Sequence, residues 1–166
     1  SNCLWQPQPA PDGAIRARLH FLEGTGFPQL RIRHSGDPTG KNASYYQLML
    51  YLRQGQKSVS QGQVYAVTQG KGRMLGSFPL PQPYALGGTL DLEFSILGDH
   101  LQVLANDTLA YEIHDTTHPG GDAWGVASLE AWFSRIQVRT LSPAPAPDET
   151  PPAARVTPST DPRILQ

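Results

Sequence analysis

The chain has 166 residues and a net charge of −1, from 13 basic and 14 acidic side chains that form no basic run. This excludes a nucleic-acid partner recognised through a basic patch, and no apolar run approaches the about 18 residues that a membrane-spanning helix needs. With 16 Gly, 16 Pro and only 16% charged residues, the composition indicates strands and turns rather than helices.

Proline-rich ends divide the chain into three parts. Residues 1–13 form a Pro-rich lead-in, residues 14–141 a single domain, and residues 142–166 a Pro-rich tail or linker with few large apolar groups to bury. Because the sequence begins Ser1-Asn2 without an initiator Met, we expect a larger parent protein. Cys3 is the single cysteine, so we expect a terminal thiol there and no internal disulfide.

The domain begins with segments that alternate apolar and polar side chains. Residues 14–21, 29–35 and 44–54 have the period of two that is typical of strands with one buried face. In the third segment, Tyr46 and Leu48 are predicted to face the core. Gly-rich stretches at 54–62 and 69–76 bracket another strand at 63–69, and residues 72–81 form a further extended segment.

Residues 88–115 predict three antiparallel strands joined by two tight turns. Gly98-Asp99 supplies the first turn, and Asn106-Asp107 the second, because Asn and Asp tolerate left-handed backbone angles. The alternation puts leucines, Phe94 and Ile96 in the core and Asp91 and Glu93 on the solvent side.

The last strand, 130–141, carries Phe133 out of parity with Ile136 and Val138. All three are expected to face the core, which requires a bulge near Ser134-Arg135. Strands of this length and spacing predict an all-β chain that folds as an antiparallel β-sandwich.

These segments resemble a known fold family. The meander at 88–115, followed by GDAWGVASLEAWFSRIQVRTL, is similar to the end of concanavalin A-like lectin/glucanase (laminin G-like) jelly-roll domains. QLRIRHSG, NASYYQLML and QVYAVTQ resemble strands of the bacterial 3-keto-disaccharide hydrolase-like family, and similar domains are appended to bacterial serine/threonine kinases. The resemblance implies a jelly roll over residues 14–141.

Two departures from this resemblance bear on catalysis. Where the hydrolase-like strand tends to carry a glutamate, this chain has Gln47, which cannot act as a base or nucleophile. Jelly-roll glucanases place three acids on one strand, and here Thr89 replaces the first, leaving Asp91 and Glu93. A glycosidase pair at Asp91 and Glu93 remains an alternative to a solvated strand face.

Metal sites are weakly indicated. His114, Asp115 and His118 combine ligand types that zinc uses, but their spacing is not diagnostic. A structural calcium ion bound by Asp115, Asp122 and backbone carbonyls is the other option. We otherwise expect no cofactor.

A binding face is the positive hypothesis. Outward positions on neighbouring strands carry Arg31, Arg33, Tyr45, Gln47, Met49 and Tyr65, with Tyr51 and Arg53 further along. Aromatic rings stack on the CH faces of sugars, while Arg and Gln hydrogen-bond hydroxyl groups. In a jelly roll the concave sheet would gather these side chains into a groove. The alternative is that loops or the Pro-rich tail cover this face and make the tyrosines part of the core.

The sequence thus predicts a non-catalytic carbohydrate- or protein-recognition module of a larger bacterial protein, with a kinase-linked parent as one option. The expected partners are a saccharide or a protein or peptide ligand, together with the parent's other domains. The resemblance implies an extracytoplasmic location, at the periplasm or the cell surface. A glycoside hydrolase acting in the groove and a purely structural spacer are the alternatives.

Overall fold

The computed structural model describes residues 2–5, 10–21, 27–37, 41–51, 53, 55–121, 123–127 and 131–142. All of the regular structure in these ranges is β-strand, which confirms the predicted all-β class. The strands are β1 (Asn2–Trp5), β2 (Gly13–Phe21), β3 (Gln29–Ser35), β4 (Ser44–Leu50), β5 (Ser58–Thr68), β6 (Lys71–Ala85), β7 (Thr89–Leu97), β8 (His100–Ala105), β9 (Thr108–His114), β10 (Ala123–Ala127) and β11 (Ala131–Thr140).

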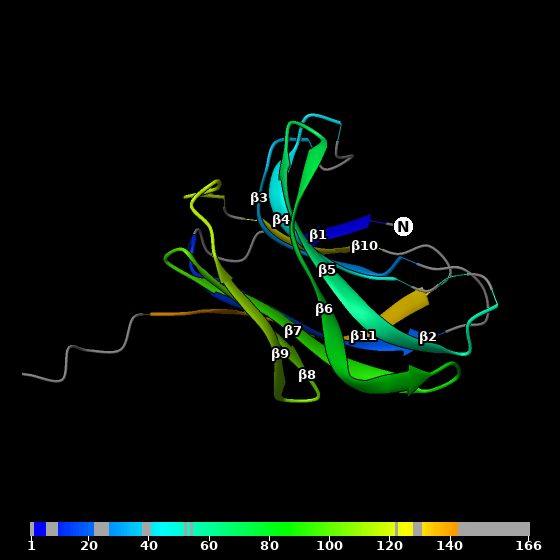
Figure 1. Cartoon of the computed structure of the whole chain (residues 1–166). Coiled ribbons are helices and arrows are strands. Elements are labelled where there is room, and N and C mark those ends of the chain that lie inside the picture. Colours follow the sequence, from blue (N-terminus) through cyan, green and yellow to red (C-terminus); the bar gives the residue numbers. More distant parts are fainter. Residues whose placement is uncertain are drawn as a thin grey trace, which may run out of the picture.

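The strands form two antiparallel sheets that pack face to face (Figure 1). The six-stranded sheet has the order β1-β10-β3-β4-β5-β6, and the five-stranded sheet has the order β11-β2-β7-β8-β9. Both orders mix strands from distant parts of the sequence, as a jelly roll requires. The predicted antiparallel sandwich is therefore confirmed.

The core lies between the inner faces of the two sheets. Because side chains alternate along a strand, every second residue of each strand reaches this layer. Its largest fully buried members are Trp124, Tyr46, Phe94, Ile15, Leu19, Leu30, Ile32, Leu48, Leu50, Leu90, Leu92 and Ile96. Burial of this apolar surface holds the two sheets together.

The predicted meander is confirmed as β7-β8-β9. Gly98 has a φ of 63°, and Asn106 and Asp107 have φ values of 47° and 65°, so both turns use the left-handed backbone that their residues favour. Asp91 and Glu93 lie on the outer face of the five-stranded sheet, as the alternation predicts.

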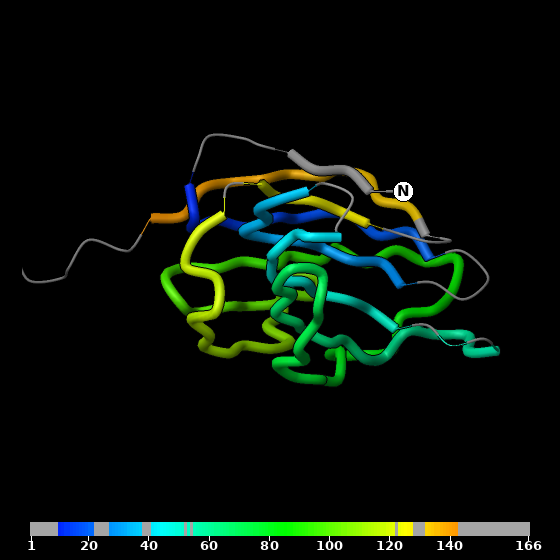
Figure 2. The backbone as a smooth tube through the Cα atoms, turned by 90° about the horizontal axis from the view of Figure 1, so that it is seen from above, coloured from blue at the N-terminus to red at the C-terminus, as the bar shows by residue number. Residues whose placement is uncertain are grey.

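The predicted bulge in the last strand is also confirmed. The pairing of β11 with β2 shifts register between Ser134 and Gln137, where Arg135 has a φ of 49°. The shift brings Phe133, Ile136 and Val138 all against the core. Figure 2 shows β11 (orange) running along β2 (blue), so the two ends of the domain lie side by side.

The N-terminal segment departs from the prediction of a lead-in outside the domain. Asn2–Trp5 form strand β1, which pairs with β10 at the edge of the six-stranded sheet. Four residues ahead of the first proline are too few to show the alternation that identifies a strand, and it is the backbone pairing with β10 that makes them one. Residues 143–166, most of the predicted tail, lie outside the described residues.

Among the described residues, no helix has the length and apolar character to cross a membrane.

Candidate functional site

The outer face of the six-stranded sheet brings together five of the six predicted binding residues. Arg31 on β3 pairs in register with Gln47 on β4, and Gln47 pairs with Tyr65 on β5. These three side chains therefore form a row across three neighbouring strands. Tyr45 and Met49 flank Gln47 on the same face of β4, because residues two apart on a strand point the same way.

An aromatic ring lies at the centre of this face. The guanidinium carbon of Arg31 lies 4.5 Å from the centroid of the Tyr45 ring. The His34 ring stacks on the same tyrosine, with centroids 5.0 Å apart and planes 5° apart. Ala43 and Val67 form a small apolar cluster with Tyr45, against which Tyr65 packs. We call Arg31, His34, Tyr45, Gln47 and Tyr65 the Tyr45 site.

Three polar atoms of the Tyr45 site have no hydrogen-bond partner in the part of the chain that the structure describes. Nη2 of Arg31 donates to Oε1 of Gln29 at 2.9 Å, but its Nε and Nη1 are buried and unpartnered. Nε2 of His34 is buried and unpartnered as well. Since buried polar groups are nearly always hydrogen-bonded, these atoms indicate a place where a further group can bind.

Burial shifts the pKa values of the two ionisable nitrogen-bearing side chains in the site, Arg31 and His34. Burial lowers the pKa of Arg31. Burial is the larger cause that lowers the pKa of His34, and the positive charge of Arg31 lowers it further. The charge of Asp37 acts in the other direction and raises it. His34 is therefore neutral at pH 7, and Arg31, which proteins do not deprotonate, carries the charge.

The site is closely packed. The exposed fraction is 6% for Tyr45, 8% for Arg31 and 9% for Gln47, whereas Met49 and Tyr65 are half-buried. The hydroxyl of Tyr65 donates to Oε1 of Gln63 at 2.8 Å. A ligand on this face would contact the half-buried side chains of Met49 and Tyr65 first, with the Tyr45 ring beneath them. The burial of Tyr45 is also what we expect if loops or the Pro-rich tail cover this face, so burial alone does not separate the two interpretations.

The prediction that Arg33 shares this face is wrong. The pairing of β3 with β4 shifts register between Ile32 and Ser35, and Arg33 has a φ of 49°. This bulge turns Arg33 away from Arg31, into the end of the sandwich, where it is 3% exposed. There Arg33 has a structural role, because it donates hydrogen bonds to the backbone carbonyls of Pro11 and His118.

The same bulge brings in a residue that the alternation missed. Strict alternation along β3 puts His34 on the core side with Leu30 and Ile32. The extra residue reverses the parity, so His34 lies on the outer face against Tyr45. A left-handed arginine inside a strand has no sequence signature, which is why His34 was not predicted.

Tyr51 and Arg53 lie beyond the end of β4. The Tyr51 ring lies 5.1 Å from the Phe27 ring, and the Arg53 guanidinium lies 5.3 Å from the Tyr51 centroid. They form a separate contact rather than part of the Tyr45 site.

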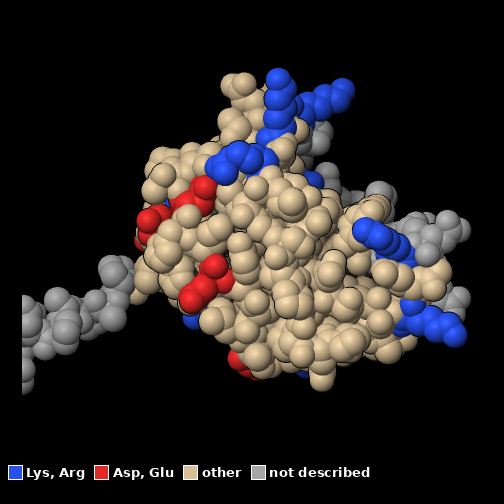
Figure 3. Space-filling model, viewed as in Figure 1, with Lys and Arg blue, Asp and Glu red and all other residues tan. Residues whose placement is uncertain are grey.

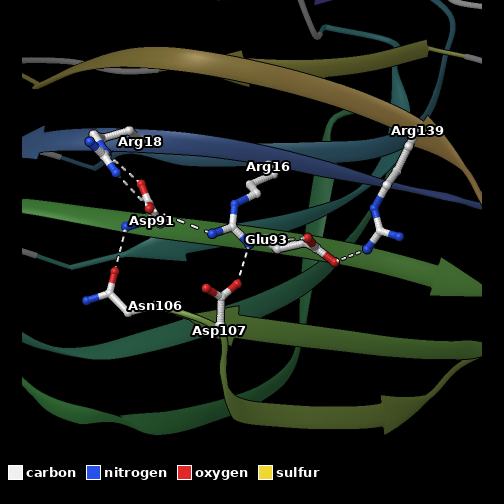
Figure 4. Close-up of polar contacts among 7 residues, drawn as sticks. All are labelled: Arg16, Arg18, Asp91, Glu93, Asn106, Asp107 and Arg139. Atoms are coloured by element: carbon white, nitrogen blue, oxygen red, sulfur yellow. Dashed lines mark hydrogen bonds and ion pairs between the residues drawn. The ribbon is translucent and has the colours of Figure 1, made fainter.

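The candidate glycosidase pair lies on the opposite side of the molecule, in an ion network (Figure 4). Arg18 contacts Asp91 through two hydrogen bonds of 2.7 and 3.0 Å. Arg139 donates to Glu93 at 2.6 Å. The guanidinium of Arg16 lies 3.7 Å from Asp91 and 3.8 Å from Glu93, and thus bridges the two acids.

This network does not suit acid catalysis. The hydrogen bond from Arg18 lowers the pKa of Asp91, whereas a general acid needs a raised pKa. Both carboxylates already have guanidinium partners, as charged pairs on a solvated strand face commonly do.

We expect Glu93→Gln to cost about 2 kcal/mol of unfolding free energy, because the nearly buried carboxylate loses its charge-assisted hydrogen bond with Arg139. Saccharide affinity should not change, because Glu93 and the Tyr45 site are on different sheets. Urea denaturation and isothermal titration of the same variant measure the two effects. A loss of saccharide turnover in this variant would instead support the hydrolase alternative.

The predicted metal ligands have other partners. His114 contacts Asp99 at 3.0 Å, and its ring stacks on His100, with centroids 4.5 Å apart. His118 is buried, with its ring edge against Tyr46. Within the described part of the chain, no group of three or more His, Cys, Asp or Glu could hold a metal ion. Asp122, named for calcium, lies outside it.

Asp115 anchors the loop between β9 and β10. The buried Tyr46 hydroxyl donates to Oδ1 of Asp115 at 2.8 Å and accepts from the His118 N–H at 3.0 Å. Burial raises the pKa of Tyr46 to about 12. Burial would also raise the pKa of Asp115, but hydrogen bonds from Thr117, Tyr46 and Arg73 outweigh it and lower the pKa to about 2. The ionised carboxylate is thus the form that the fold stabilises.

Acid should therefore weaken the fold through Asp115. Its pKa is depressed in the folded state, so its contribution is complete above the unfolded pKa of about 4 and is lost as the pH falls towards 2. The shift corresponds to about 2 kcal/mol. We expect Asp115→Asn to lose this amount at pH 6 and little at pH 2, as measured by urea denaturation. An equal loss at both pH values would contradict the assignment.

Charge on the surface is dispersed. On the face drawn in Figure 3, basic side chains lie mainly at the top and right and acidic ones at the left, with a broad uncharged area between them. No single-sign patch covers this face.

Comparison with known proteins identifies the fold. No family model matches the chain, and no curated protein sequence matches it. Among solved structures, the carbohydrate-binding module CBM66 from Bacillus subtilis superimposes with a TM-score of 0.63 at 14% identity, covering 84% of this chain and 82% of that one. Sheep galectin-11 in complex with glycerol gives a TM-score of 0.61 at 10% identity, covering 82% and 96%.

A tetrameric galectin from the ball sponge Cinachyrella sp. gives a TM-score of 0.60 at 10% identity, covering 86% and 100% of the two chains. At such low identity these similarities establish a jelly-roll sandwich of the lectin type. The neighbours share that fold without a traceable sequence relationship.

Proposed function

We propose that the chain is a carbohydrate-binding module and that its saccharide lies over the Tyr45 site. The observation that carries the proposal is the row of Arg31, Gln47 and Tyr65 beside the Tyr45 ring, on one outer face of a lectin-type sandwich. The similarity in fold to CBM66 and to galectins supports a saccharide as the ligand.

The chemistry of the Tyr45 site suits a sugar. Tyr65, which is half-buried, offers an aromatic ring to the CH face of a pyranose or furanose ring, and the Tyr45 ring beneath holds Arg31 and His34 in place. Among the described residues, Arg31 and His34 present unpartnered nitrogen atoms, and Gln47 adds an amide whose Nε2 lies 3.9 Å from the Met49 sulfur. Hydroxyl groups could satisfy such donors and acceptors directly.

The finer context rests on the sequence resemblance. We propose that the module belongs to a larger bacterial protein, with a kinase-linked parent among the options, and acts outside the cytoplasm. The same resemblance supports the other domains of that parent as partners. Expression of the chain with the native leader and neighbouring domains, followed by cell fractionation, would test this placement.

One observation favours a second candidate, a structural spacer whose face is covered. Tyr45 and Gln47 are more than nine-tenths buried, which a spacer with a filled face also explains. A spacer would bind no saccharide, so a binding experiment separates the two functions.

The experiment is a glycan-array screen of the full chain, followed by titration of the best oligosaccharide. The double variant Tyr45→Ala/Gln47→Ala should lose binding. Trp132→Ala removes an aromatic side chain that is 49% exposed on the other sheet, so it is the matched control and should bind normally. Absence of binding to every glycan would reject the proposal in favour of the spacer, and equal loss in both variants would reject the site.

A further inference from the structure

We infer that the saccharide bound by the Tyr45 site carries an anionic group, a carboxylate or a sulfate, which pairs with Arg31. This inference rests on the proposed saccharide site and specifies the class of its ligand.

The charge of Arg31 has no counter-ion among the residues that the structure describes. Among the described residues, no carboxylate forms an ion pair with Arg31, and its one polar side-chain partner is the neutral amide of Gln29. Arg31 is more than nine-tenths buried, and two of its three nitrogen atoms have no hydrogen-bond partner within the described ranges. A guanidinium in this position keeps its charge, because its pKa is too high for deprotonation to relieve the burial.

Other arginines of the molecule show the contrast. Arg33, which is equally buried, pairs with Asp12 at 2.7 Å and donates to three backbone carbonyls. Arg18 forms two hydrogen bonds with Asp91. Arg33 is the other arginine buried among the described residues, and the chain supplies acceptors for its guanidinium. Arg31 differs because its Nε and Nη1 have no acceptor among the described residues.

The contact with Tyr45 does not replace the missing anion. A cation over an aromatic face gains less than an unpaired buried charge costs, even in a desolvated setting. Hydroxyl groups of a neutral sugar would satisfy the nitrogen donors but not the charge. A carboxylate or sulfate supplies acceptors and charge together, and charge-assisted hydrogen bonds are about twice as strong as neutral ones.

The neighbouring side chains favour an anion as well. His34 lies against the same tyrosine and has an unpartnered nitrogen among the described residues. Burial first and the charge of Arg31 second lower its pKa, and they outweigh Asp37, which raises it. On β10, the residues in register with Gln29, Arg31 and His34 are Ala127, Gly125 and Ala123, none of which carries charge or bulk. The row of Arg31 and His34 thus has no acidic neighbour on that strand.

The test compares saccharides that differ in charge alone. Oligogalacturonides and their methyl esters, and sulfated galactose oligomers and their desulfated forms, are titrated into the full chain. We expect at least one acidic member to bind ten times or more tightly than its neutral partner, with an affinity that falls as salt rises. The two pairs separate carboxylate from sulfate recognition.

Two variants and one control variant locate the effect. Arg31→Gln should abolish the preference for the acidic form. Gln47→Glu places a carboxylate in register with Arg31 and should abolish it too, because the chain then supplies its own counter-ion. Gln63→Glu adds the same charge further along the face, opposite Met49, and should keep the preference. Thermal unfolding confirms that each variant is folded.

Equal or tighter binding of the neutral forms would overturn the inference and leave the carbohydrate-binding function intact. A preference that survives in folded Arg31→Gln would also overturn it. Binding of no saccharide, acidic or neutral, would overturn the inference and the proposed function together.

Discussion

Replacing Arg33 with alanine is expected to cost about 3–5 kcal/mol of unfolding free energy, the largest effect of any single polar side chain considered. Its guanidinium donates four hydrogen bonds of 2.6–2.8 Å, to the carbonyls of Pro11, Gly98 and His118 and to Oδ1 of Asp12. The variant leaves these acceptors without their donor at the buried end of the sandwich.

The size of this effect follows from what Arg33 joins. Its contacts tie β3 to the segment before β2, to the β7–β8 turn and to the loop before β10. Chemical denaturation measures the loss. Arg73→Ala is the control, because Arg73 is largely exposed and pairs with Asp115 from the surface, so it should cost about 1 kcal/mol or less. Equal losses in the two variants would contradict the structural part assigned to Arg33.

Replacing Tyr45 with alanine is expected to weaken saccharide binding by about 2 kcal/mol or more, roughly 30-fold in Kd. The ring is the one surface in the Tyr45 site that contacts both Arg31 and His34, so its removal takes away the stacking platform and displaces two polar groups. Isothermal titration measures the change in affinity.

Tyr45→Phe separates the ring from the hydroxyl and should retain most of the affinity, because the aromatic face remains. A fall in affinity as large as that of the alanine variant would show that the hydroxyl, rather than the ring, holds the ligand. Both variants are checked by thermal unfolding, since Tyr45 is also part of the small apolar cluster with Ala43 and Val67.

The sequence predicts this fold well where one face of each strand is buried. Period-two alternation identified the meander, and the misplaced Phe133 identified the bulge in β11, because a core position has to be filled by an apolar residue. The outer-face positions of Asp91 and Glu93 were predicted for the same reason, but Glu93 is only 7% exposed there, because Arg16 and Arg139 lie against its carboxylate.

The prediction failed where backbone geometry rather than side-chain pattern decides. In β3, the bulge at Arg33 reverses parity between two residues that are both polar, so no misplaced apolar side chain reveals it. One local change moved Arg33 out of the Tyr45 site and brought His34 in. Strand β1 was missed because four residues are too few to show a period, and its partner β10 is far along the chain.

The composition of the Tyr45 site was predictable in part. Arg31, Tyr45, Gln47, Met49 and Tyr65 share a face because their strands are adjacent and regular. The contact of Arg31 with Tyr45 and the unpartnered nitrogen atoms depend on side-chain rotamers, which no spacing encodes. The charge argument for the ligand therefore comes from the structure alone.

The most direct test of a saccharide site on the six-stranded sheet is an NMR titration of the ¹⁵N-labelled chain with the best oligosaccharide from the array. We predict saturable shifts of the backbone amides of β3, β4 and β5, centred on Arg31, Gln47 and Tyr65, with the amides of His20 and Trp132 unchanged. Shifts confined to the outer face of the five-stranded sheet would contradict this account.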